Sequence, residues 1–150
     1  MQVGSVQGND TRELVEPCIS VVIPAYNEEE AIGPTIEEFK QVIEMMNVDY
    51  EIVVVDNNST DKTAEVATKH GARVVREVRQ GYGNACIKGL REARGKIIVL
   101  TEADRTFAAR DLKKMLAYLE ESVPELRSSS SRRERRWAGY STGETFFWLS

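Results

Sequence analysis

Short apolar runs alternate along this chain with longer stretches in which apolar residues recur every three or four positions. The runs at 18–24, 52–55, 72–76 and 96–101 have the length and β-branched content of strands. The stretches between them carry one apolar stripe each, which is typical of helices that cover a sheet. Strand and helix therefore alternate four times with short connections, which predicts an α/β domain of three α/β/α layers around a mainly parallel sheet.

The run at 52–55 is unbroken by polar residues, and we predict that it forms the central strand, buried on both faces. It leads directly into Asp56 and a turn of Asn57, Asn58 and Ser59, whose side chains bond nearby backbone. Open α/β sheets bind ligands in the crevice outside the carboxyl ends of parallel strands. Asp56 is therefore expected to contact a ligand.

Turn and cap residues predict the remaining boundaries. We expect the first strand to end at Pro24, which cannot donate to a sheet ladder. Asn27 is the predicted N-cap of a helix with Glu28–Glu30 in its first turn, and Pro34 is expected to begin the main helix. A helix over 60–70 should close at Gly71.

The third strand, 72–76, is less apolar and is expected near an edge of the sheet. It is followed by Gly81-Tyr-Gly-Asn-Ala-Cys86, which begins like a G-x-G-x-x-G fingerprint. Cys86 replaces the third glycine and the segment follows the third strand, so a dinucleotide-binding site is not predicted. We interpret Arg79–Ala85 as a flexible loop whose backbone approaches a ligand or crosses the sheet.

The composition of the 150 residues, 41% hydrophobic and 29% charged, indicates one soluble globular domain. The polar start, 1–16, reads as a flexible lead without a signal-peptide core, so we expect a cytoplasmic protein. No apolar run approaches the ~18 residues that a membrane span needs. Cys18 and Cys86 are expected to be reduced, buried thiols.

The acidic residues dominate the first 121 residues, whose net charge is −6, whereas 122–150 carry +2. An acidic body argues against a nucleic-acid binder, which would show a basic stripe. We divide the chain into the lead at 1–16, the domain at 17–121 and an irregular Ser- and Arg-rich tail at 122–150. The tail has no strand or helix period. It has three candidate origins: a disordered regulatory tail, a basic membrane-surface contact, or, as we favour, a terminus unrelated to the ancestral fold that arose by truncation or a reading-frame change.

Glu102 and Asp104 follow the fourth strand and are separated by one residue, so extended backbone would point both carboxylates to one side. Two carboxylates held close together are costly unless a cation or a hydrogen-bond donor compensates their charge, and a divalent metal is the natural candidate. Mg²⁺ and Mn²⁺ prefer such hard oxygen ligands and are held by one or two carboxylates plus substrate phosphates. This pair is therefore a candidate metal site, and it lies at the same sheet edge as Asp56 and 24–28.

Four motifs in order resemble the family 2 glycosyltransferases of GT-A fold, most closely the dolichyl-phosphate mannose synthases and related polyprenyl-phosphate glycosyltransferases. They are Val21-Val-Ile-Pro-Ala-Tyr-Asn-Glu28, Val53-Val-Val-Asp-Asn-Asn-Ser-Thr-Asp61, Gln80-Gly-Tyr-Gly-Asn84 and Thr101-Glu-Ala-Asp104. The resemblance covers roughly 18–121. It implies the donor-binding half of a nucleotide-diphospho-sugar transferase with a Rossmann-like sheet, apparently truncated.

The resemblance implies a role for each motif. Pro24, Ala25, Tyr26 and Glu28 would line the pocket for a GDP- or UDP-linked sugar, with Val54 and Asp56 at the base and ribose. Glu102, Ala103 and Asp104 would form the acidic motif, in which Asp104 ligates Mg²⁺ or Mn²⁺ and Glu102 contacts the metal shell or the ribose. The sugar would pass with inversion to an acceptor such as dolichyl or polyprenyl phosphate, which makes a peripheral contact with the cytoplasmic face of a membrane plausible.

Two departures from the family pattern keep alternatives open. Glu102 stands where Asp is commoner, and Arg105 would either pair with Asp104 or reach the diphosphate. No acceptor half is recognisable after Glu121, and the arginines at 132, 133, 135 and 136 read as a solvated tail. The alternatives are therefore an inactive remnant that only binds nucleotide, or a nucleotidyltransferase, although the acidic segment 24–28 lacks the basic glycine-rich loop of the latter.

Overall fold

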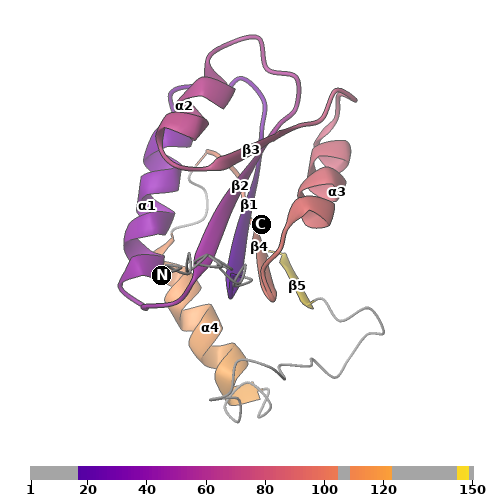
Figure 1. Ribbon diagram of the computed structural model, residues 1–150. Coiled ribbons are helices and arrows are strands. Elements are labelled where there is room, and N and C mark those ends of the chain that lie inside the picture. The colour runs from indigo at the N-terminus through magenta and orange to yellow at the C-terminus, as the bar shows by residue number, and fades with distance from the viewer. Residues whose placement is uncertain (1–16, 105–108, 123–144, 149–150) are drawn as a thin grey trace, which may run out of the picture.

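Five parallel strands form one sheet in this computed structural model, which describes residues 17–104, 109–122 and 145–148 (Figure 1). The strands lie in the order β3-β2-β1-β4-β5. Their bounds are Ile19–Ala25 for β1, Tyr50–Asp56 for β2, Arg73–Arg76 for β3, Ile97–Leu100 for β4 and Thr145–Trp148 for β5. The predicted α/β class is confirmed, and so is the edge position of β3.

The centre of the sheet is β1 rather than β2. All seven residues of β1 are buried, and β1 pairs with β2 on one side and β4 on the other. The run at 52–55 was predicted to be the central strand, but it forms β2, which lies next to the centre. The runs that form β1 and β2 are similarly apolar, so the sequence could not indicate which of them is central. Pro24 lies inside β1, where it was expected to end the strand. It is tolerated because β4 pairs with β1 only as far as Val22.

Helices cover both faces of the sheet (Figure 1). One face packs against α1 (Ile32–Glu44), α2 (Thr63–Lys69) and α4 (Arg110–Ser122). The other face packs against α3 (Tyr82–Glu92). Alternation along β1 explains the division, since Val21 and Ile23 join the first core while Val22 joins the second. The three-layer architecture follows from this.

Two helix starts differ from the prediction. Asn27 is not an N-cap: α1 begins five residues later at Ile32, after Ala31, and has no acidic residue in its first turn. The reason is that the Asn27 side chain accepts the backbone N–H of Thr60 in a neighbouring loop instead. The α3 helix begins at Tyr82, so most of the segment that we interpreted as a flexible loop is helical.

The carboxyl-terminal tail was also predicted without a strand, yet Thr145–Trp148 forms β5, an edge strand in register with β4. The pairing joins Ile97 to Thr145 and Leu100 to Trp148. A strand of only four residues forms because it pairs with a neighbouring strand, and this pairing leaves no periodic pattern in the local sequence.

The amino-terminal edge of the sheet is closed by one polar network. Glu51 accepts hydrogen bonds from the Ser20 hydroxyl at 2.6 Å, the Arg94 N–H at 2.7 Å and the Arg73 guanidinium at 3.0 Å. Burial raises the pKa of Glu51, but the bonds from Ser20, Arg94 and Arg73 outweigh it and lower the pKa below its ordinary value. Strand ends are therefore tied together at this edge, opposite the edge where ligands are expected.

Close packing of α3 on the sheet depends on Gly89, because a Cβ there would overlap Val22 and approach Val55 to 2.9 Å. We expect Gly89→Ala to lower the free energy of unfolding by about 1–3 kcal/mol through overpacking, measured by urea denaturation. The control is Gly83→Ala in the same helix, where an added Cβ meets nothing within 4 Å. That variant should be neutral or stabilised by up to about 1 kcal/mol, and equal stability of both variants would contradict the packing argument.

Candidate functional site

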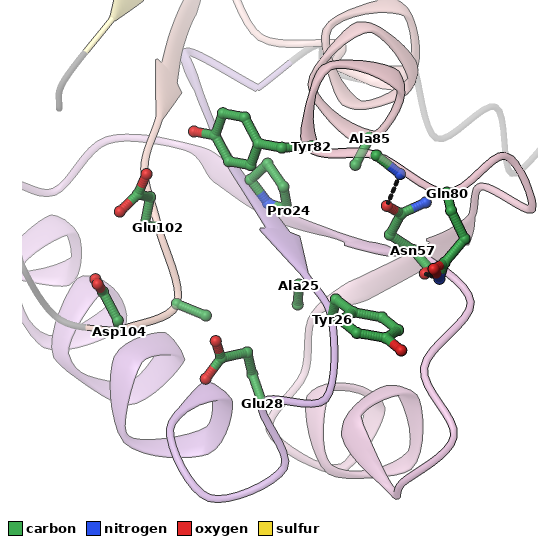
Figure 2. Close-up of a pocket in the computed structure, with 12 residues that line it drawn as sticks. Pro24, Ala25, Tyr26, Glu28, Asn57, Gln80, Tyr82, Ala85, Glu102 and Asp104 are labelled. Atoms are coloured by element: carbon green, nitrogen blue, oxygen red, sulfur yellow. Dashed lines mark hydrogen bonds between the residues drawn. The ribbon is translucent and has the colours of Figure 1, made fainter.

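A cavity of about 490 Å³ opens at the carboxyl-terminal edge of the sheet (Figure 2). Four strand ends supply its wall: the end of β1 with the residues after it, the residue after β2, the start of α3 beyond β3, and the segment after β4. The lining residues are Pro24, Ala25, Tyr26, Glu28, Asn57, Gln80, Gly81, Tyr82, Ala85, Glu102, Ala103 and Asp104. Seven of the nine residues that the sequence singled out thus share one cavity.

The first part of the wall follows β1. Asn27 has a left-handed φ of 52°, which turns the chain so that Tyr26 and Glu28 both line the cavity. The Glu28 carbonyl accepts the N–H groups of Ala31 and Ile32, so the turn leads into α1. The side chain of Tyr26 is 49% exposed, which leaves an aromatic face accessible at the rim.

The second part of the wall follows β4. The strand ends at Leu100 and the backbone turns at Ala103 and Asp104, so the extended geometry that we expected for this triplet does not continue. The side chains of Glu102 and Asp104 nevertheless both line the cavity (Figure 2). Ala103 is held beneath them, because its carbonyl accepts the Thr35 hydroxyl of α1 at 2.8 Å.

The third part of the wall is the start of α3, which includes Gln80, Gly81, Tyr82 and Ala85. Gly81 has a φ of 129°, a value that favours glycine, and it immediately precedes the helix. We expected the backbone of this segment to approach a ligand or cross the sheet, but we assigned none of its side chains to the site, although its position after β3 could have indicated them. All loops that follow parallel strands emerge at the same edge.

Tyr82 lies between a thiol and a carboxylate. Burial raises the pKa of the Tyr82 phenol, and its contacts with Cys86 and with Glu102 raise it further. Burial also raises the pKa of the Cys86 thiol, which is 9% exposed. The phenol and the thiol therefore stay protonated and uncharged near neutral pH.

Val54 and Asp56 do not line the cavity. Val54 is fully buried in the core between the sheet and α1. Asp56 is 6% exposed, and its carboxylate accepts the Ser59 N–H at 3.2 Å. The next residue, Asn57, lines the cavity in its place. The expected contact is thus shifted by one residue, because successive side chains at the end of a strand point to opposite sides.

Hydrogen bonds join the loop after β1 to the loop after β2. The Asn27 N–H donates to the Ser59 hydroxyl, and the Thr60 N–H returns a bond of 2.8 Å to the Asn27 side chain. The Glu28 N–H donates to the Thr63 hydroxyl at 2.9 Å. Polar residues within 57–63 therefore organise the rim by bonding backbone of the loop after β1, a loop more distant in the sequence than the nearby backbone that we expected them to bond.

The chemistry of the acidic pair fits a divalent cation. Glu102 and Asp104 are both exposed on the cavity wall and offer hard oxygen donors. Within 17–104, 109–122 and 145–148 there is no group of three or more His, Cys, Asp or Glu that could hold a metal by itself. A shell built from these two residues would thus be completed by other oxygens, which phosphates supply in many Mg²⁺ sites.

Several expectations fall outside the described residues. They concern Arg105 and the arginines at 132, 133, 135 and 136. His70, which follows α2, donates a 2.9 Å hydrogen bond from Nδ1 to the carboxylate of Glu37 in α1, and it does not line the cavity. Among the helices that the structure describes, none has both the length and the apolarity to cross a membrane.

Comparison with known proteins finds the family model described as Glycosyl transferase family 2, which matches residues 20–143. An uncharacterised glycosyltransferase of Mycobacterium tuberculosis is 42% identical over 105 residues, which are 70% of this chain and 45% of that protein. Dolichyl-phosphate beta-glucosyltransferase of Drosophila melanogaster is 34% identical over 122 residues, which cover 73% and 37% of the two chains. The chain thus spans less than half the length of these relatives.

The fold is shared with solved structures. Glucosyl-3-phosphoglycerate synthase from Mycobacterium tuberculosis, in complex with Mn²⁺, UDP and glucosyl-3-phosphoglycerate, superposes with a TM-score of 0.59 at 31% sequence identity. The match covers 69% of this chain and 39% of that one. The expected GT-A architecture and the likeness to family 2 are both confirmed.

The rim contacts of Asn27 generate a stability prediction. Asn27→Ala removes the oxygen that accepts the Thr60 N–H. It also leaves alanine at a left-handed φ of 52°, which alanine tolerates less well than asparagine. Together these changes should lower the free energy of unfolding by about 1–2 kcal/mol. Asn27→Gly loses the same acceptor but relieves the backbone, so it should be the more stable variant by about 1 kcal/mol. Urea denaturation measures both, and an alanine variant as stable as the parent would refute this account of the rim.

Proposed function

The chain belongs to glycosyl transferase family 2, and from this premise we propose that its cavity holds a GDP- or UDP-linked sugar as donor for transfer with inversion. The observation that carries the proposal is the convergence of four strand-end segments on a single cavity. A crevice at the carboxyl ends of parallel strands is the general ligand site of such sheets. The cavity volume of about 490 Å³ lies within the range of small-ligand sites.

The segment after β1 would receive the nucleotide. Pro24 and Ala25 offer a flat apolar floor, and the half-exposed ring of Tyr26 offers a stacking surface at the rim. Glu28 adds an acceptor for hydroxyl or amide donors of the nucleotide. Val54 and Asp56, which lie behind the wall, would support this floor rather than touch the donor.

The acidic pair would hold the metal. Asp104 is the proposed ligand of Mg²⁺ or Mn²⁺, and Glu102 a second ligand or a contact to the metal shell. Such a cation neutralises charge that develops on the departing nucleotide diphosphate. Without it, Glu28, Glu102 and Asp104 would repel an anionic diphosphate, so the acidity of the wall itself supports a requirement for a cation. The Mn²⁺ in the glucosyl-3-phosphoglycerate synthase complex is consistent with this proposal.

The proposed acceptor is a polyprenyl or dolichyl phosphate, as the likeness to dolichyl-phosphate beta-glucosyltransferase suggests. A phosphate monoester is largely ionised near neutral pH, with a second pKa around 6. Its oxygen can therefore attack the sugar without a strong general base. The protein would act at the cytoplasmic face of a membrane through a peripheral contact. We propose 17–121 as the donor-binding domain and 1–16 as a lead, with 122–150 as a tail whose strand β5 joins the sheet of that domain.

Binding of the donor can be measured directly by calorimetric titration of GDP and UDP with Mn²⁺. We expect Asp104→Asn to abolish Mn²⁺-dependent binding or weaken it at least about 10-fold, because one hard oxygen donor is lost. The matched control is Asp111→Asn, which removes an exposed carboxylate paired with Lys114 on α4 and should bind like the parent. Failure of both nucleotides to bind the parent protein with metal present would count against the proposal.

An assay of sugar transfer would identify the acceptor and would distinguish an enzyme from a protein that only binds nucleotide. Labelled GDP- and UDP-sugars are offered with dolichyl phosphate in detergent, or with 3-phosphoglycerate as the competing acceptor. We expect Mn²⁺-dependent label in the lipid fraction, because the ionised phosphate is already nucleophilic. Label in phosphoglycerate alone would reassign the acceptor. Binding without transfer to either would support the nucleotide-binding alternative.

A further inference from the structure

Asn57 occupies a junction between the strand ends. It follows β2 directly, is 5% exposed and lines the cavity. Its backbone N–H donates to the carbonyl of Ala25 at the end of β1, at 2.9 Å. Its backbone carbonyl accepts the side-chain amide of Gln80 at 3.0 Å. One residue thus contacts both the segment after β1 and the segment that precedes α3.

The side chain of Asn57 uses both ends of its amide. The Nδ2 group donates to the carbonyls of Glu77 at 3.0 Å and Arg79 at 2.8 Å. The Oδ1 atom accepts the N–H of Gly81 at 2.9 Å, the bond drawn in Figure 2. Two donors and one acceptor on a short side chain are what an amide offers and a carboxylate does not. Aspartate at this position would leave the two carbonyls without their donors.

The segment that Asn57 holds, Glu77–Gly81, is also folded on itself. The Glu77 carboxylate accepts the backbone N–H of Arg79 at 2.8 Å and pairs with its guanidinium. The Glu77 N–H donates to the carbonyl of Asp56, so the segment leaves β3 beside the end of β2. It behaves as a compact unit whose attachment to the sheet runs largely through Asn57.

We propose that Asn57 is a positioning residue: its amide fixes Glu77–Gly81 against the end of β2, so that Gln80, Gly81 and Tyr82 stand at the cavity wall. The consequence for ligand binding rests on the proposed function, in which this cavity takes the nucleotide sugar. The structural part does not, because the position of the segment can be measured without a ligand. Asn57 acts through the segment that it holds.

The first test measures amide hydrogen exchange without ligand in Asn57→Asp and Asn57→Gly. Asp removes the two donors and Gly removes the whole side chain. We expect exchange in residues 77–82 to accelerate at least about 10-fold, because buried carbonyls lose their partners. Protection in β1 and β2 should stay unchanged. Should the glycine variant fail to fold, the nearly isosteric aspartate variant decides the outcome.

The matched controls are Asn58→Asp and Asn58→Gly, one residue further along. Asn58 does not line the cavity, has a positive φ that glycine tolerates, and makes one exposed bond to Arg76. Asp at either position adds the same charge near the same edge, so a charge effect alone would appear in both. We expect both Asn58 variants to exchange like the parent protein.

The second test titrates GDP and UDP with Mn²⁺ at a temperature where every variant is fully folded. We expect the dissociation constant to rise about 10-fold in both Asn57 variants, since a loosened wall must be ordered on binding, and to stay within about twofold in the Asn58 controls. Unchanged exchange in 77–82, or an equal loss of protection throughout the sheet, would overturn the proposal. If the parent binds neither nucleotide, the proposed function fails while the exchange result still decides the role of Asn57.

Discussion

The parallel pairing of β1 with a neighbour on each side is the constraint on which the rest of this structure depends. Because β2 and β4 both run parallel to β1 in fixed register, their carboxyl ends reach the same edge. Burial of all seven β1 residues makes a slip of register costly, since a shift by one residue would exchange the two core faces. Convergence of distant segments on one cavity is a consequence of this pairing.

The two edges of the sheet are built differently. At the amino-terminal edge, Glu51 is surrounded by donors from three other segments, so its charge is neutralised locally. At the carboxyl-terminal edge, backbone and side-chain amides bind the loops to one another, while Glu28, Glu102 and Asp104 face the cavity. Carboxylate oxygens gathered on a cavity wall suit a divalent cation, and a cation in turn favours an anionic ligand.

The amide-rich turn after β2 connects the loops that surround the cavity. Ser59 and Thr60 exchange bonds with Asn27, and Thr63 accepts from Glu28. Asn57 alone of this turn lines the cavity, and it also binds the segment before α3. The organisation of the wall is thus a property of hydrogen bonds between loops that lie twenty or more residues apart in the sequence.

The sequence by itself determined the class of fold, the edge position of β3 and the region of the cavity. Local hydrophobic patterns predicted which residues are buried, as in the run Val53–Val55 and the stripe of Ile32, Ile36 and Phe39. Four motifs in order indicated the family. The tertiary structure alone decided which strand is central and where α1 and α3 begin. It also decided that Thr145–Trp148 pairs with β4, and that Asn57 lines the cavity where Asp56 was expected. Each of these depends on a partner distant in the sequence, as when Thr60 takes the side chain that would have capped a helix at Asn27. Local propensity cannot predict which of two partners a side chain will bond, because the free energy difference comes from contacts between distant segments.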